Sequence, residues 1–393
     1  MHNVNVYIML ASASWKVNHA AQQSRLDCKY AIKSKGFGFL NVKAIITGMN
    51  KNNPPSRKRA SGNTDARGRM EDVARLAGVS IITVSRVINQ PDKVAAGTRA
   101  RVEAAIARIG YVPNLTAGSL ASSRSHVIGA IVPTIDNSIF AETIRGLSQT
   151  LAPRGYQLLL GQTGYEAQAE DDLVAAFLGR RVDGLVLTGV HHSPLTRKRL
   201  VGAGVPVVET WDLTPSPIDM LAGFSNHAAG REIARHLLAR GYRRFGAAGG
   251  GDERSTARLA GFAEAVEMVA DAKVETVILP AGTSFEGGRL GLKQLADREP
   301  RPQAIFFSND VLAVGALMEC KRRGLRVPED IAIAGFVDLD IAQAVEPGLT
   351  TVHVGSRQIG EEAARLLLAR LDGETVADPV RDLGFRVVAR ASA

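Results

Sequence analysis

The sequence lacks the features that define several common protein classes. None of its apolar runs approaches the roughly 18 residues that a membrane-spanning helix needs. Its only two cysteines, Cys28 and Cys320, are too few for a disulfide framework, which indicates a reducing, cytoplasmic environment. At 393 residues, the chain is longer than the roughly 250–300 residues that share one hydrophobic core. We therefore expect more than one folded unit and no membrane span.

Acidic residues are scarce in the first third of the chain. The net charge is +10 over residues 1–69, +3 over residues 70–126 and −4 over residues 127–393. A basic terminal module on a mildly acidic body is typical of a head that binds a polyanion, followed by a body with a separate task. On charge alone, a solvated basic tail that binds nothing is the alternative.

Residues 1–69 show no hydrophobic period and no helix caps, so we expect a disordered basic extension. The apolar stretch Val6–Ala13 is short, and no positive residue precedes it, which argues against a secretory signal. Met49 begins an ordinary basic arm. Our hypothesis is that translation starts near Met49, in which case residues 1–48 are not part of the protein.

Residues 70–113 predict three short helices around one small core. Apolar residues at i, i+3, i+4 and i+7 mark the inner face of the first helix, from Met70 to Ala77. Gly78 ends this helix, and Ser80 can cap a second one. A third helix is expected at about Thr98–Ile109. A Gly-containing turn between two helices is typical of a helix-turn-helix, although a generic three-helix bundle has the same periodicity.

The order of residue types in this region is more specific than its hydrophobic periodicity. Asp72–Ser80, followed by Thr83–Asn89, Tyr111–Asn114 and Leu120-Ala121, resembles the headpiece of the LacI/GalR family of bacterial repressors. The resemblance implies a DNA-binding headpiece at residues 70–113 and a hinge helix with its linker at residues 114–126. It also implies a double-stranded DNA operator as the partner.

The resemblance assigns roles to individual residues of the headpiece and hinge. Arg86 can donate two hydrogen bonds to guanine O6 and N7 in the major groove. Apolar side chains at the start of the second helix can contact thymine methyl groups, and hydroxyl or amide side chains suit phosphate oxygens. Leu120 matches a leucine that is wedged between base pairs in the minor groove. The implied DNA-binding residues are Ile81, Ile82, Thr83, Ser85, Arg86, Asn89, Asn114 and Leu120.

The sequence departs from the family at two helix starts and in the hinge. Arg69 and Ala95 stand where members usually have hydroxyl caps, and each loss costs about 1 kcal/mol. Gly118 lies inside the hinge helix, where glycine costs about 1 kcal/mol relative to alanine. We therefore expect the hinge to be disordered in the absence of DNA.

Residues 127–393 alternate apolar strands with helices, a pattern that predicts parallel sheets covered on both faces. The fold class expected is α/β, with two doubly wound lobes behind an all-α headpiece. This region resembles the family's sugar-binding core, which is related to periplasmic binding proteins. Lobe one is placed at about 127–225 and 354–378, and lobe two at about 226–353 and 379–393. The chain is expected to cross between lobes near 225–226, 352–354 and 377–382.

Ligands of doubly wound sheets bind beyond the carboxyl ends of the strands, so polar residues there are candidates for a cleft. Arg258 matches the family's effector-binding arginine, with a lobe-bridging ion pair as the alternative. Asn309 and Asp310 match a polar pair at the head of a helix, where Asp310 could equally be only a cap. The pair His191-His192 could instead be solvated. The candidate effector-binding residues are Asn137, Phe140, Tyr165, His191, Asp212, Arg258, Asn309, Asp310 and Asp338.

Several segments resemble the branch of the family that represses gluconate utilisation, among them Gly164–Glu166, Val182–Thr188 and Asp252–Arg254. That resemblance implies a transcriptional repressor controlled by gluconate or a close sugar acid. Another sugar or a phosphosugar is the alternative. The chain ends soon after Phe385–Ala389, without room for a tetramerising tail, so a homodimer on a palindromic operator is expected.

Enzyme interpretations are weaker. Gly246–Gly251 follows an expected strand, but it lacks the G-x-G-x-x-G order of a dinucleotide loop. No set of cysteines and histidines has the spacing of a metal site, and neither a nucleophile elbow nor a P-loop lysine is present. A transport-related binding protein would have no use for a DNA-binding head. We therefore expect no enzymatic activity and no cofactor.

Overall fold

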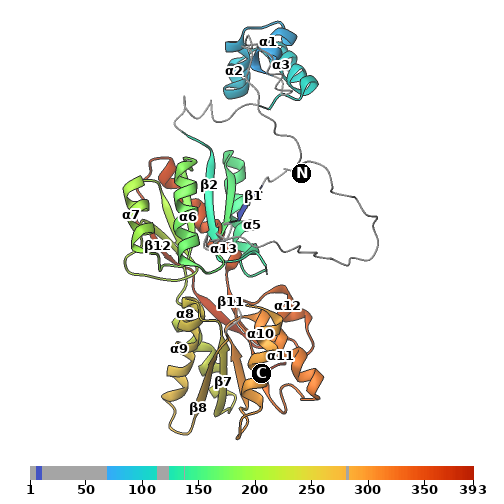
Figure 1. Ribbon diagram of the computed structural model, residues 1–393, viewed down its shortest axis with the longest axis vertical. Helices are drawn as coiled ribbons and strands as arrows, with labels where there is room; N and C mark the ends of the chain where they lie inside the picture. The colour runs from blue at the N-terminus through green and yellow to red at the C-terminus, as the bar shows by residue number, and fades with distance from the viewer. Residues whose placement is uncertain (1–5, 11–68, 113–123, 137, 280–282) are drawn as a thin grey trace, which may run out of the picture. The chain divides into compact units, whose positions relative to one another are not determined.

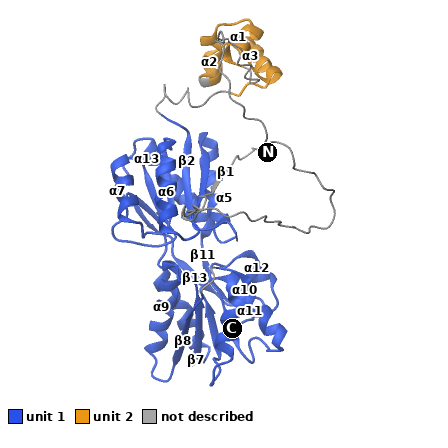
Figure 2. Ribbon diagram, viewed as in Figure 1, with its two compact units in different colours: residues 1–12, 119–393 blue, residues 13–118 orange. Residues whose placement is uncertain are grey.

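The computed structural model describes residues 6–10, 69–112, 124–136, 138–279 and 283–393 (Figure 1). The chain divides into two compact units, one formed by residues 13–118 and the other by residues 1–12 with 119–393 (Figure 2). We refer to the described parts of these units as the headpiece and the core. None of the described helices is long and apolar enough to cross a membrane.

The headpiece consists of α1 (Met70–Ala77), α2 (Ile81–Asn89), a short 3-10 turn (Pro91–Lys93) and α3 (Ala96–Ile109). Val73, Val84 and Val102, one from each α-helix, are fully buried in a shared core. Gly78 ends α1 with φ 66°, a left-handed backbone that favours glycine. The Ser80 hydroxyl accepts a hydrogen bond from the Thr83 backbone N–H and caps α2. The expected helix-turn-helix is therefore present.

The starts of α1 and α3 lack the usual side-chain caps. Neither Arg69 nor Ala95 caps the helix that follows it with its side chain. Asp72 partly compensates in α1, since its carboxylate accepts a hydrogen bond of 3.1 Å from the backbone N–H of Arg69. Asp72 also pairs with Arg75. At the start of α3, the methyl side chain of Ala95 cannot accept a hydrogen bond.

In the described part of lobe one, seven parallel strands form a sheet in the order β1-β3-β2-β4-β5-β6-β12. Helices α5 and α13 pack on one face, and α6 and α7 pack on the other. The strands after β1 are β2 (Val127–Val132), β3 (Gln157–Gln162), β4 (Gly184–Thr188), β5 (Val207–Thr210), β6 (Met220–Gly223) and β12 (Val380–Asp382). The helices are α5 (Ala141–Leu151), α6 (Ala167–Gly179), α7 (Pro194–Ala203) and α13 (Ser356–Leu371).

β1 (Val6–Leu10) lies at the edge of this sheet and pairs in parallel with β3, with Val6 opposite Leu158. This differs from the expected disordered extension over these residues. The run is apolar and can add to the open edge of a sheet, where backbone groups lack partners. A chain that began near Met49 would lack β1 and would leave β3 at the edge.

In the described part of lobe two, four parallel strands follow the order β10-β9-β7-β8. Helices α8 and α9 pack on one face and α10 and α11 on the other (Figure 1). The strands are β7 (Arg244–Gly249), β8 (Lys273–Ile278), β9 (Ala304–Phe307) and β10 (Ala332–Ala334). The helices are α8 (Asn226–Ala239), α9 (Glu253–Glu267), α10 (Phe285–Ala296), α11 (Asp310–Arg323) and α12 (Asp340–Ala344).

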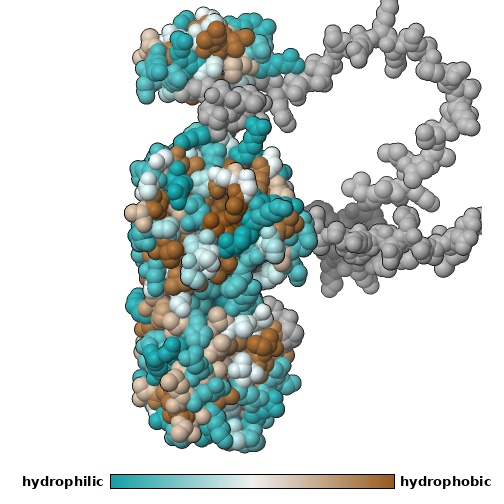
Figure 3. Space-filling model, turned by 90° about the vertical axis from the view of Figure 1, so that its left-hand side faces the viewer, coloured by the Kyte–Doolittle hydropathy of each residue, from teal (hydrophilic) through white to brown (hydrophobic). Residues whose placement is uncertain are grey.

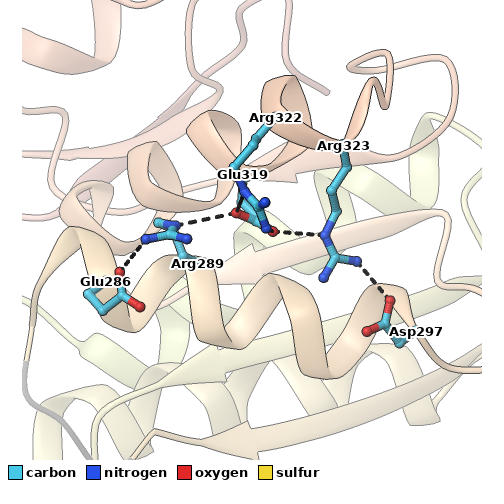
Figure 4. Close-up of polar contacts among 6 residues, drawn as sticks. All are labelled: Glu286, Arg289, Asp297, Glu319, Arg322 and Arg323. Atoms are coloured by element: carbon cyan, nitrogen blue, oxygen red, sulfur yellow. Dashed lines mark hydrogen bonds and ion pairs between the residues drawn. The ribbon is translucent and has the colours of Figure 1, made fainter.

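A charged network joins α10 to α11 on the outside of lobe two (Figure 4). Glu319 of α11 accepts hydrogen bonds from Arg322 and Arg323 of its own helix and from Arg289 of α10. Arg323 also donates to Asp297, at 2.7 Å. The hydrogen bonds from the arginines hold the pKa of Glu319 well below its usual value. Because Glu319 is only 2% exposed, these cations are the partners that its buried charge requires.

The chain crosses between the lobes after β6, at β11 and before β13. β11 (Thr351–Val354) pairs with β13 (Phe385–Val388) in an antiparallel ribbon. The third crossing lies later than the expected 377–382, because β12 still pairs with β6 of lobe one, with Val380 opposite Leu221. Leu383 also donates its backbone N–H to Gly223. Lobe one therefore extends to Asp382, and the boundary expected at residue 379 was too early.

Candidate DNA-reading helix and ligand cleft

The helix that follows the turn of the headpiece presents the residues expected to read DNA. Ile81 is 46% exposed and Ile82 is 70% exposed at the start of α2, and Arg86 is also exposed. Thr83 is half-buried, and its hydroxyl lies 2.9 Å from that of Ser80, so it is engaged in the cap of the helix. Ser85 is half-buried and Asn89 ends α2. Asn114 and Leu120 lie outside the described residues.

The exposed face of α2 therefore combines two large apolar side chains with one guanidinium. This combination suits the floor of a major groove, where thymine methyl groups and guanine acceptors lie side by side. The capping serine and threonine fix the N-terminal turn of α2, the turn that helix-turn-helix proteins bring to the bases.

The core contains a cavity of about 460 Å³ between its lobes. The carboxyl ends of β2, β3 and β4 contribute residues from lobe one, and the segments after β7 and β8 contribute residues from lobe two. This is the position expected for a ligand of doubly wound sheets. The lining residues with polar side chains are Thr163, Tyr165, Glu166, Glu170, Thr188, His191, Ser193, Asp252, Glu253, Arg254 and Thr283.

Of the predicted effector-binding residues, Tyr165 and His191 line this cavity directly. Tyr165 has φ 67°, a strained conformation for a non-glycine residue, and its backbone N–H donates to the Thr163 hydroxyl. His191 reaches across the cleft, with its Nδ1 atom 2.9 Å from a carboxylate oxygen of Glu253. Both residues therefore border the space between the lobes.

His192 fixes the loop that carries His191. Its side chain is 1% exposed, with Nδ1 2.8 Å from Glu170 and Nε2 3.4 Å from Glu209. Burial opposes the charged form, but the hydrogen bond to Glu170 and the charges of both carboxylates prevail and raise the pKa of His192 to about 9. A buried imidazolium thus links β5 and α6 to the cleft loop.

Arg258 lies deeper than the cavity wall and is 6% exposed. Its Nε donates to the Asn226 side chain at 2.7 Å, and its Nη1 donates to the Ser308 carbonyl at 2.8 Å. Its guanidinium also lies 4.0 Å from the ring centroid of Phe336. Asn226 in turn donates to the Trp211 carbonyl in lobe one. Burial lowers the pKa of Arg258 to about 10, and the hydrogen bond from Asn226 to Trp211 connects this arginine to lobe one.

Two further predicted residues, at the head of α11, are engaged within the protein. Asn309 caps α11 by accepting from the Leu312 N–H at 3.0 Å, and its amide donates to the Thr283 hydroxyl at the cavity. Asp310 is fully buried and accepts from Thr351 at 2.6 Å and from the Leu339 N–H at 2.7 Å. Burial raises the pKa of Asp310 to about 6. Asn309, rather than Asp310, is therefore the cap.

Three further predicted effector residues, Phe140, Asp212 and Asp338, do not line the cavity. Phe140 is 4% exposed, and its ring contacts that of Trp211 edge to face at 5.0 Å. Asp212 accepts from the Leu213 N–H at 2.9 Å. Asp338 pairs with His353 and with Arg390. Asn137 lies outside the described residues.

Sequence reasoning did not single out Arg254 as a cleft residue, although it lines the cavity. Its Nη1 donates to the Thr188 carbonyl of lobe one at 3.3 Å, and its guanidinium lies 5.8 Å from the Phe140 ring. A signal was available, because Arg254 and Arg258 are four residues apart on α9 and therefore share one face of that helix.

Fold and site together define a class of protein, in which a DNA-binding headpiece is joined to a two-lobed core that encloses a small ligand. Residues 69–114 match the model for bacterial regulatory proteins, lacI family, and residues 234–393 match a periplasmic binding protein-like domain. The HTH-type transcriptional regulator GntR of Escherichia coli (strain K12) is 37% identical over 317 residues, covering 80% of this chain and 96% of that protein.

Solved structures of similar proteins lead to the same family. A LacI-family transcriptional regulator from Silicibacter pomeroyi is 33% identical with a TM-score of 0.77, covering 82% of this chain and 98% of that one. The lac repressor dimer bound to operator and the anti-inducer ONPF is 26% identical with a TM-score of 0.71, covering 83% and 99%. The chain belongs to the LacI family and is a DNA-binding transcriptional repressor. The predicted fold and family are confirmed, and the relatives are regulators rather than enzymes.

Proposed function

We propose that this repressor binds a palindromic operator as a homodimer and that a small sugar acid, gluconate or a close relative, controls that binding. The observation that carries the effector assignment is the chemistry of the cavity lining. The proposal also agrees with the sequence resemblance to the gluconate branch of the family.

The cavity suits a polyol with a single acidic group. Its lining provides carboxylates, which accept hydrogen bonds from neighbouring hydroxyl groups, at Glu166, Glu170 and Asp252. Hydroxyl side chains from both lobes can bond to the rest of a polyol chain. Among the lining residues, Arg254 is the one arginine, and a planar guanidinium matches a carboxylate. A phosphosugar would bring about −1.5 to −2 charges among these acids.

The sites of the core and the headpiece are proposed to communicate through the relative position of the lobes. Without effector, the lobes of a dimer hold the two hinge segments, residues 114–126, close enough to fold together in the minor groove. Bound effector shifts the lobes, the hinge segments separate, and operator affinity falls. Such a shift is limited by the ligand's differential affinity for the two states, commonly about 1–3 kcal/mol.

In this proposal the effector-binding residues act at two depths. Tyr165 and His191 contact the ligand from the cavity wall. Asn309 lies one contact behind it, since it donates to the lining residue Thr283, and Arg258 supports the cleft from within lobe two. The other proposed residues, which support this arrangement from behind or lie outside the described range, are Asn137, Phe140, Asp212, Asp310 and Asp338.

The proposed DNA contacts are likewise assigned by how exposed each side chain of the headpiece is. Ile81, Ile82 and Arg86 would read base edges, because their side chains are exposed on α2. Contacts to the phosphate backbone are assigned to Thr83, Ser85 and Asn89, and those of the hinge to Asn114 and Leu120.

A homodimer follows from the proposed operator symmetry, because two headpieces are needed for two half-sites. Large apolar side chains are exposed on lobe two, with Ile278 of β8 53% exposed, Phe285 of α10 43% and Met318 of α11 52%. Figure 3, which views the side of the core that lies to the left in Figure 1, shows that brown areas also occur among teal ones on another side of this lobe. β8 is also an edge strand of its sheet. We propose that the part of lobe two that carries Ile278, Phe285 and Met318 contributes to the dimer.

A thermal-shift comparison of candidate effectors tests the proposal. The full-length protein is heated with gluconate, its keto and phosphorylated forms, a nucleoside, neutral sugars and a nicotinamide cofactor. We expect the largest rise in melting temperature with gluconate or another monocarboxylic sugar acid, because only a ligand of the native state stabilises it. The largest shift with a phosphosugar or neutral sugar would contradict the sugar-acid assignment, and the largest shift with a nicotinamide cofactor would favour an enzyme.

A further inference from the structure

Arg254 and Arg258 lie on one face of α9, and they differ in how close their hydrogen-bond and ion-pair partners within the protein are. We propose that Arg254, rather than Arg258, binds the carboxylate of the effector and sets the preference for an acid over a neutral sugar. This inference rests on the proposed function, and it assigns the acidic end of the ligand to one side chain of the cavity wall.

Arg258 lies behind the cavity wall, and two of its N–H groups are already bound within the protein. Its hydrogen bonds to Asn226 and to the Ser308 carbonyl are short, at 2.7 and 2.8 Å. The Phe336 ring covers it at 4.0 Å, and it does not line the cavity. Through Asn226, which donates to the Trp211 carbonyl of lobe one, Arg258 helps to connect the lobes, and it is not part of the cavity lining.

Arg254 is the less satisfied of the two. Its hydrogen bond to the Thr188 carbonyl is long, at 3.3 Å, and its nearest carboxylate, that of Asp252, is 4.0 Å away. Asp252 is itself engaged, since its carboxylate accepts from the Ser255 N–H and caps α9. The Arg254 side chain is 11% exposed, so its charge is largely removed from water and gains from a new anionic partner.

The two histidines near the cavity already have close acidic partners. His191 lies 2.9 Å from a carboxylate oxygen of Glu253. His192 is held between Glu170 and Glu209 and is not a lining residue. Arg254 also stands in the first turn of α9, where the positive end of the helix dipole favours an anion. These features leave Arg254 as the cation best placed for a carboxylate.

Isothermal titration of the full-length protein with gluconate and with its uncharged amide, gluconamide, tests the assignment. The wild type is expected to bind gluconate about ten- to a hundredfold more tightly, the range for one charge-assisted contact. Arg254→Gln is expected to abolish this preference by weakening gluconate alone. Arg254→Lys keeps the charge without the planar fork and is expected to retain part of the preference.

Arg258→Gln and Arg235→Gln serve as comparisons. Arg258→Gln is expected to weaken both ligands by similar factors, because it disturbs the cleft and not the charge contact. Arg235 is an exposed arginine of α8 paired with Glu232, and Arg235→Gln is expected to change neither affinity. Thermal melting of each variant shows whether it folds. If Arg254→Gln does not fold, the affinities of Arg254→Lys for gluconate and gluconamide test the assignment instead.

The outcomes separate this inference from the proposed function. If Arg254→Gln keeps the preference for gluconate while Arg258→Gln loses it, the carboxylate is bound by Arg258 and our assignment is wrong. If the wild type binds both ligands equally, Arg254 does not bind the carboxylate and our inference is wrong, whereas a sugar-like effector is still supported. If the wild type binds neither ligand, the effector assignment itself is wrong, and the role of Arg254 falls with it.

Discussion

The headpiece and the core form their binding surfaces in different ways. The residues expected to read bases lie within α2, a helix of 9 residues, and are exposed there. The cavity of the core joins residues from Pro133 to Thr283, which come from separate strand ends in both lobes. The first surface therefore depends on one helix and its cap, whereas the second depends on how distant segments pack.

The largest contrast is expected between two glycines. A Cβ atom on Gly230 of α8 would lie 2.0 Å from the Arg258 carbonyl oxygen, so Gly230→Ala forces α8 and α9 apart. We expect the core to lose about 3 kcal/mol of unfolding free energy, together with the contact between Arg258 and Asn226. Urea unfolding followed by circular dichroism measures the loss.

Gly97→Ala in α3 is the matched change in the headpiece. A Cβ atom there meets nothing within 4 Å, and Gly97 is not among the glycines with positive φ. Alanine at this helical position is expected to be neutral or to stabilise by up to about 1 kcal/mol. If Gly230→Ala changes the unfolding free energy as little as Gly97→Ala does, the close packing of α8 against α9 is not needed for the stability of the core.

The buried imidazolium of His192 is expected to make core stability depend on pH. Its pKa is about 9 in the folded protein and 6.5 by default, so its favourable contribution is complete below about pH 6.5 and is lost as the pH rises through about 9. The full effect is up to about 3 kcal/mol. His192→Gln should remove this part of the pH dependence, as measured by unfolding free energies at about pH 6 and pH 9.5.

His191→Gln provides the control for the histidine substitution, because His191 is 62% exposed and pairs with an equally exposed Glu253. That variant is expected to retain the pH dependence of the wild type. A wild-type pH dependence in His192→Gln as well would mean that other groups of the core cause it.

Arg86→Ala tests the local character of the headpiece surface. We expect each half-site of the operator to lose about 1–3 kcal/mol of binding free energy, with effector binding unchanged. Arg99→Ala, which removes an arginine of α3 that pairs with Glu103, is the control and should have a small effect. Electrophoretic mobility shift with specific and random duplexes measures both. Equal losses on both duplexes would show that Arg86 contacts phosphates and reads no base.

Sequence reasoning was most accurate where structure is local. Residue type was enough to place Gly78 at the end of α1 and Ser80 at the cap of α2, because each acts within one helical turn. It missed β12, since a strand of 3 residues has no readable period and is defined by its pairing with β6. That pairing moved the end of lobe one.

The cleft shows the same limit at the level of side chains. The sequence located the strand ends and hence Tyr165 and His191. It could not show that Asn309 uses its amide for Thr283 and its oxygen for α11, because these partners are set by packing. The family motif directed attention to Arg258, whereas the different degrees of satisfaction of Arg254 and Arg258 emerge only from their contacts.

The central claim is that one chain couples DNA binding by the headpiece to ligand binding by the core. The most direct measurement is fluorescence anisotropy of a labelled operator, selected from random DNA by the protein itself, with and without gluconate. We predict that saturating gluconate weakens operator binding about 5- to 150-fold. Unchanged operator affinity under conditions in which calorimetry shows gluconate bound would contradict the account.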